Sequence, residues 1–108
     1  MKDFFDVWVL AGNFPFHGRI LADAIRSTFM QRETNIEAAP ACFSDRFVQT
    51  PAKAAQWVGF LRNSRVEVAP AEFAEVVAHA RNFLQPVAQA LSVQRTFEKI
   101  WSEGGPWR

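Results

Sequence analysis

The strongest constraint on the fold of this chain is the helical spacing of its apolar residues, which is clearest over residues 18–31. Apolar and polar side chains separate there into two sets, three or four residues apart. The first set comprises Ile20, Leu21, Ala24, Ile25, Thr28 and Phe29, and the second comprises Arg19, Asp23 and Arg26. Because an α-helix completes a turn every 3.6 residues, each set occupies one face. The spacing predicts an amphipathic helix from Gly18 to Gln31.

Four other segments show the same period. We expect a first helix from Asp3 to Ala11, a helix from Pro51 to about Ser64, and another from Pro70 to Leu84. A last helix is predicted around three apolar residues near the end of the chain, Phe97, Ile100 and Trp101. The C-terminal Trp107 lies in a tail that cannot be helical but could pack back onto the bundle.

Capping residues and prolines mark where these helices begin and end. Gly12, Asn13 and Pro15 should stop the first helix, and Ser44 is expected to cap one short turn that holds Phe47 and Val48. Thr50 and Pro51 are a typical cap and first-turn proline. Proline removes a helical hydrogen bond and clashes one turn back, so Pro86 predicts a bend near Phe83 or a new helix over residues 86–91.

No segment combines alternating polarity with β-branched residues, and residues 65–68 are too short to form a sheet alone. The expected fold class is all α, a small orthogonal or irregular bundle of about five helices. The length of 108 residues fits one domain spanning residues 1–108.

Charge and cysteine content exclude several classes of function. The 12 Lys and Arg balance 11 Asp and Glu, so nucleic acid is not an expected partner of this chain alone. The one cysteine, Cys42, rules out an intramolecular disulfide and a multi-thiolate zinc site, and we expect a half-buried apolar role for it. No signal peptide or membrane span can be read, which leads us to expect a cytoplasmic protein.

The candidate site residues open the first helix. Lys2 and Asp6 are four residues apart and Asp3 and Asp6 are three apart, so their side chains can converge on one face. The alternative is that acidic residues in a first turn simply favour the helix dipole. His17 is expected to be a solvated residue at a helix start and His79 a polar or interfacial helix residue.

The segment from Lys2 to Leu10 reads KDFFDVWVL and resembles the KDFYDIWLL segment of the abortive-infection nucleotidyltransferase toxins of the AbiEii/AbiGii family. Later helical segments are similar to that family as well. They include Phe16 to Arg32, Thr50 to Arg62, Phe73 to Pro86, and the terminal Gly104-Gly105-Pro106-Trp107.

This resemblance implies an N-terminal nucleotidyltransferase core with metal-binding acidic residues in complete members, followed by a helical region that closes the site. It implies that Lys2 faces the nucleotide phosphates, and that Asp3 and Asp6 order the site or assist the acceptor group. The core is missing from this sequence, so we expect the motif to be inert alone. A nucleoside triphosphate and Mg²⁺ would bind only if a core is supplied. The start at Met1, directly before the motif, suggests a truncated, split or misassigned reading frame.

Our first hypothesis is therefore a helical C-terminal module of an AbiEii-type toxin that a separate nucleotidyltransferase core completes, or that an antitoxin protein binds. The alternative hypothesis is a protein interaction module, because 11 Phe and 4 Trp exceed what a small helical core must bury and suggest an exposed aromatic patch. An independent enzyme is a third and less favoured reading.

Overall fold

The computed structural model of the chain describes residues 1–64, 69, 70 and 72–108. Within them, the α-helices are α1 (Lys2–Asn13), α2 (Gly18–Gln31), α3 (Asp45–Val48), α4 (Pro51–Ser64) and α5 (Phe73–Ser92). A 3₁₀ turn, η1 (Ala41–Phe43), precedes α3, and two short strands, β1 (Phe16–His17) and β2 (Ile100–Trp101), pair in antiparallel fashion. The predicted helical fold is confirmed, with this small sheet added. Residues 65–68, the nearest approach to a strand in the sequence, lie outside the described residues.

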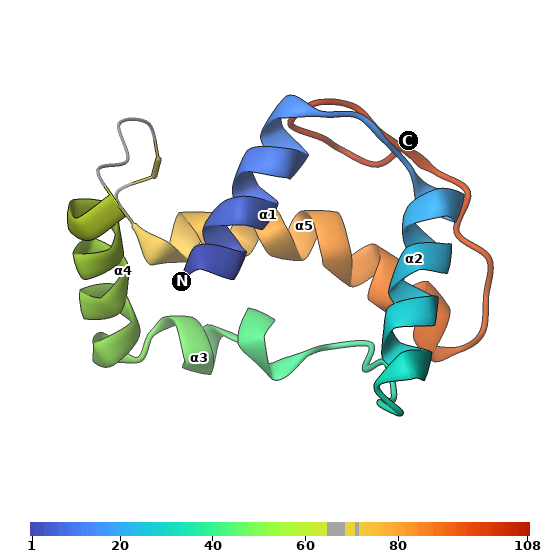
Figure 1. Cartoon of the computed structure of the whole chain (residues 1–108), viewed down its shortest axis with the longest axis horizontal. Helices are drawn as coiled ribbons and strands as arrows, with labels where there is room; N and C mark the ends of the chain where they lie inside the picture. Colours follow the sequence, from blue (N-terminus) through green and yellow to red (C-terminus); the bar gives the residue numbers. More distant parts are fainter. Residues whose placement is uncertain (65–68, 71) are drawn as a thin grey trace.

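Helix α5 is the element on which the other helices are assembled. Figure 1 shows α5 running along the molecule, with α4 and α2 at its opposite ends and α1 crossing it between them. Seven α5 side chains are buried, namely Phe73, Val76, Val77, Ala80, Phe83, Val87 and Leu91. The helical spacing of the sequence predicts four of them, Phe73, Val76, Val77 and Ala80, together with Leu84, which is partly buried, and the whole stripe packs α5 against its neighbours.

The core consists of three aromatic-rich clusters along α5. The first centres on Trp57 and Phe73 and includes one face of α1. The second joins Ala22 of α2 to Val87 and Leu91, and the third joins Ala11 of α1 to Phe83 and Trp101. Residues at both ends of the sequence therefore pack on the same central helix.

Helix α5 continues through Pro86, so the predicted new helix starting at this proline is wrong. The side chains on either side, Phe83 and Val87, are buried, and their burial favours a continuous helix at this point. In addition, the indole Nε1–H of Trp107 donates a hydrogen bond to the carbonyl oxygen of Phe83 at 2.8 Å. Pro86 has no N–H to donate to the carbonyl oxygen one turn earlier in the helix, and Trp107 supplies a donor to the adjacent carbonyl oxygen, that of Phe83.

The predicted last helix around Phe97, Ile100 and Trp101 is also wrong, because residues 100 and 101 form strand β2. Phe16 faces Trp101 and His17 faces Ile100 across the pair. Side chains alternate in a strand, which leaves Ile100 53% exposed and Trp101 only 1% exposed. Burial of the large Trp101 ring and pairing with β1 thus outweigh the weak helical spacing of this segment.

The predicted helix ends are confirmed at Ser44 and Pro51, whereas α1 continues through Gly12 and Asn13, at which the sequence predicts its end, and α5 continues beyond Leu84 to Ser92. Ser44 caps α3, since its hydroxyl oxygen accepts a hydrogen bond from the backbone N–H of Phe47 at 3.2 Å. Pro51 is the first residue of α4 as predicted, but the Thr50 hydroxyl, which the sequence predicts to cap this helix, instead donates to the carbonyl oxygen of Arg46 at 3.0 Å. Helix α5 begins at Phe73, three residues after the predicted Pro70.

In the part of the chain that the structure describes, no helix has both the length and the apolar character that crossing a membrane requires.

Candidate functional site

The candidate site lies on the first two turns of α1, whose opposite face is fixed in the core. The ring of Phe4 packs edge-on against Phe73 of α5, with 5.3 Å between centroids. Phe5 packs against Phe60 of α4 at 5.6 Å and stacks on Trp8 at 6.2 Å. These apolar contacts determine which way the charged side chains of the same turns can point.

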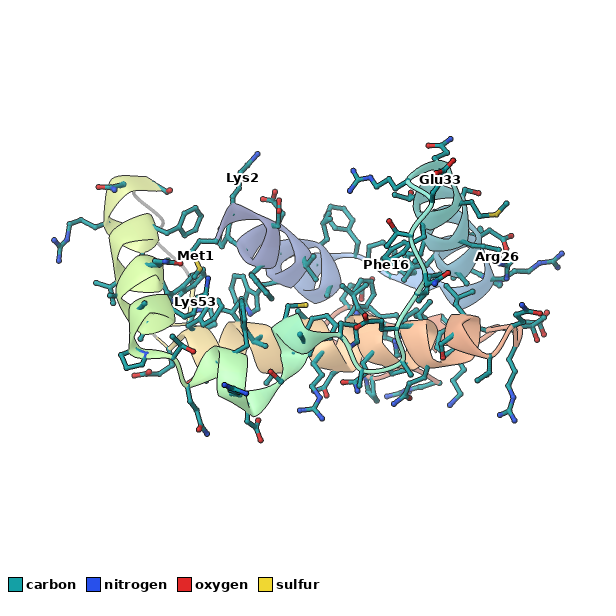
Figure 2. All side chains as sticks on the ribbon, turned by 90° about the horizontal axis from the view of Figure 1, so that it is seen from below. Met1, Lys2, Phe16, Arg26, Glu33 and Lys53 are labelled. Atoms are coloured by element: carbon teal, nitrogen blue, oxygen red, sulfur yellow. The ribbon has the colours of Figure 1, made fainter. Side chains whose placement is uncertain are left out.

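Lys2, Asp3 and Asp6 lie on the solvent side of α1. The Lys2 Nζ is 4.0 Å from the Asp6 Oδ2, and these side chains are 80% and 49% exposed. Asp3 is exposed in the first turn of the helix. Figure 2 shows Lys2 projecting away from the body of the fold, whereas the neighbouring Met1 lies toward α4.

The spacing argument is thus confirmed for Lys2 and Asp6, which the helix brings within ion-pair distance. An exposed pair of this kind contributes little to folding, because water screens it and two long side chains must be ordered. The pair is therefore not needed to hold α1 in place. These side chains are free to meet a ligand or a second protein.

Metal-dependent phosphoryl transfer needs several acidic ligands and a site that excludes water. Over residues 1–64, 69, 70 and 72–108, no three His, Cys, Asp or Glu side chains are arranged to hold a metal ion. Asp3 and Asp6 stand in open solvent, where the high dielectric weakens their effect on a bound charge. As it stands, this face can offer one cation and two carboxylates to a site assembled around it.

His79 is the partly buried histidine of α5, in agreement with the predicted interfacial position. Its ring lies 5.9 Å from that of Trp101 at 70°. The Nε2 atom is buried and has no hydrogen-bond partner in the described part of the chain. Burial lowers the pKa of the His79 imidazole below its ordinary value, since desolvation disfavours the charged form. The sequence could not show the Trp101 contact, which depends on strand β2.

His17 and Cys42 agree with the roles expected from the sequence. His17 is exposed and immediately precedes α2. Cys42 is half-buried in η1, and burial raises the pKa of its thiol. A raised pKa reduces the thiolate fraction at neutral pH, so this cysteine is a poor nucleophile.

The aromatic residues do not form the exposed patch that their number suggested. All 11 Phe and 4 Trp fall within the described residues. Phe14 is the one exposed residue among them, with 52% of its surface accessible to solvent. Most of the others pack against each other, as in the stacking of Trp57 on Phe60 with centroids 5.5 Å apart. Most of the aromatic residues therefore belong to the three core clusters.

An apolar groove of about 400 Å³ lies away from α1, between α2, the segment 34–43 and α5. Its walls include Ile25 and Phe29 of α2, Ile36 of the connecting segment, and Leu84 of α5. Helix α2 and the segment that follows it build this groove together with α5, which is distant in sequence, and no local motif marks it. Sequence reasoning consequently missed it.

Comparison with known protein families gives a match over residues 1–79 of the 108, to the family described as nucleotidyl transferase AbiEii toxin, type IV TA system. No curated protein and no solved structure matches the chain. The family match includes α1 with Lys2, Asp3 and Asp6, and covers well over half of the sequence. The chain therefore belongs to the AbiEii family.

Proposed function

We propose that this chain is the helical module of an AbiEii-type nucleotidyltransferase toxin and that it acts together with a nucleotidyltransferase core outside these 108 residues. The observation that carries the proposal is the placement of the KDFFD segment. It belongs to the family-matched region and lies on a helix that is anchored in the core from behind, yet its charged side chains face solvent. A second protein surface can reach them without any rearrangement of the module.

In this proposal Lys2 binds the phosphates of a nucleoside triphosphate. An ammonium group on a flexible stem is a suitable phosphate ligand, and it becomes far more effective when a second surface excludes water from it. Asp3 and Asp6 orient Lys2 or accept a proton from the acceptor group. The Mg²⁺ ions, with the carboxylates that hold them, belong to the core.

The expected partners are the core itself and, because the family is that of a type IV toxin–antitoxin system, an antitoxin protein. The cytoplasm, where nucleoside triphosphates are available, is the proposed compartment. The module alone carries too few metal ligands on its α1 face for nucleotide transfer.

The test is titration calorimetry with Mg²⁺ and each of the four nucleoside triphosphates. It is run on the chain alone and on the chain mixed with the separately produced core of a complete family member, alongside a labelled-transfer assay. We expect no tight binding by the chain alone. In the mixture we expect binding that Lys2→Ala weakens at least about tenfold, the loss for one charge-assisted contact.

Lys99→Ala is the matched control, because it removes another exposed lysine that is far from Lys2 in the sequence and keeps the backbone carbonyl oxygen of residue 99 that accepts from the Gly18 N–H. Micromolar binding by the chain alone that Lys2→Ala abolishes would overturn the proposal in favour of an independent enzyme. Equal affinities of the Lys2→Ala and Lys99→Ala mixtures for nucleoside triphosphate would show that Lys2 is not part of the binding site.

A further inference from the structure

The last twelve residues, 97–108, form a segment that we call the clasp, because it contacts α1, β1, α2 and α5 together. Figure 1 shows it running beside the connection between α1 and α2. Two of its groups donate to a single acceptor, the carbonyl oxygen of Ala11 near the end of α1. These donors are the Trp101 Nε1–H at 2.7 Å and the Gly104 N–H at 2.9 Å.

These hydrogen bonds satisfy a carbonyl group near the end of α1, where the helix itself provides no N–H donor. The last carbonyl groups of a helix lack intrahelical partners, and a buried carbonyl without a donor is costly. Ala11 is fully buried in the folded chain, so the clasp and not water supplies the donors to its carbonyl group. The clasp therefore fixes the C-terminal end of α1.

The other end of α1 is held independently, by the packing of Phe4 on Phe73. Contact at one end of a helix allows it to pivot or to roll about its axis, whereas contact at both ends fixes its orientation. The direction in which Lys2, Asp3 and Asp6 point depends on this orientation.

The clasp is in turn attached to the rest of the fold. The Trp107 ring stacks on Phe83 of α5 with centroids 5.7 Å apart and 4° between planes, and its Nε1–H donates to the Phe83 carbonyl oxygen. At the start of α2, the Gly18 N–H donates to the carbonyl oxygen of Lys99 at 2.7 Å. The clasp is therefore attached to the central helix by the stacked ring of residue 107 as well as by the indole hydrogen bond.

We propose that the clasp orients the Lys2, Asp3 and Asp6 face of α1, with Trp101 as its positioning residue. The clasp lies beyond residues 1–79, the part that matches the family. The proposal assigns a role to this additional segment. Its consequence for nucleotide binding rests on the proposed function, but the hold on α1 does not.

Amide hydrogen exchange of the 108-residue chain without nucleotide tests this inference, using Trp101→Phe and, as matched control, Trp107→Phe. Each variant keeps an aromatic ring in the clasp and removes one indole N–H. We expect Trp101→Phe to raise exchange of the amides of residues 9–13 about two- to tenfold, the effect of losing one hydrogen bond on local opening. Trp107→Phe should raise the exchange of amides within residues 83–88 of α5 and leave the exchange of residues 9–13 close to the rate in the parent chain.

A uniform rise over all helices in Trp101→Phe, or no rise in residues 9–13, would overturn the proposal, because either result means that Trp101 does not act on α1 in particular. If Trp101→Phe fails to fold, Gly105→Ala is compared with the parent chain, since a methyl group on Gly105 would meet the Trp101 ring. Equal exchange of residues 9–13 in this variant and in the parent would then count against the clasp. Nucleotide titration is a separate measurement, so a failure of the proposed function remains distinguishable from a failure of the clasp.

Discussion

Replacement of Gly105 by Ala should destabilise the protein more than the same replacement at Gly104. Both glycines have positive φ angles, 80° for Gly104 and 85° for Gly105. A Cβ atom on Gly104 would meet nothing within 4 Å, whereas one on Gly105 would lie 2.6 Å from the Trp101 Cη2 and 2.9 Å from its Cζ2. The two variants therefore share the backbone strain and differ in the steric clash.

The left-handed conformation costs an L-residue about 1–2 kcal/mol, and both variants incur this loss. Alanine also restricts the unfolded chain at both positions, which offsets part of the loss in each variant. Trp101 is 1% exposed and cannot move aside freely, so overpacking should cost Gly105→Ala about 1–3 kcal/mol more.

Urea unfolding followed by far-ultraviolet circular dichroism measures the free energy of unfolding of each variant. We expect that of Gly105→Ala to be lower than that of Gly104→Ala by about 1–3 kcal/mol. Equal values would refute the reasoning, because they would mean that the Trp101 ring yields without cost and that the clasp is loosely packed.

Two further predictions concern the core. His79 binds a proton less readily in the folded chain than in the unfolded chain, so the free energy of unfolding should fall as the pH drops from about 7 toward 5, above the range in which most carboxyl groups titrate. His79→Leu should flatten this dependence and His17→Gln, at an exposed position, should retain it; the same pH dependence in all three proteins would contradict the role of His79. Trp57 is fully buried and its Nε1–H donates to the Pro70 carbonyl oxygen at 3.0 Å, so Trp57→Ala should lower the free energy of unfolding by about 3–5 kcal/mol. Trp57→Phe, which keeps a ring, should lose less in urea unfolding, and a loss below about 1 kcal/mol for the alanine variant would be incompatible with this packing.

The helices that the sequence predicts best are those whose pattern is local and strong. Helix α2 has the bounds expected from its apolar face, Gly18–Gln31, and the Ser44 cap follows from a preference that acts within one turn. The ion-pair distance between Lys2 and Asp6 likewise depends only on helical spacing.

The features that the sequence does not reveal depend on partners far along the chain. Trp101 has a spacing that suits a helix, but its strand conformation comes from pairing with Phe16 and from the Ala11 carbonyl group. Pro86 interrupts no helix, because Phe83 and Val87 are buried around it and Trp107 donates to the Phe83 carbonyl group. A local pattern contains no information about such distant contacts, so helical spacing misjudges Trp101 and the helix-breaking tendency of proline misjudges Pro86.

The pairing of β1 with β2 has a consequence for the order in which the chain folds. A two-residue antiparallel pair is not stable on its own, and closing the long loop between Phe16 and Trp101 costs entropy before any contact compensates for it. The local helices must therefore form and collapse on α5 first, and the strand pair closes afterwards. On the ribosome this closure has to wait until residue 101 has left the exit tunnel, so β1 should remain unpaired long after its own residues have emerged.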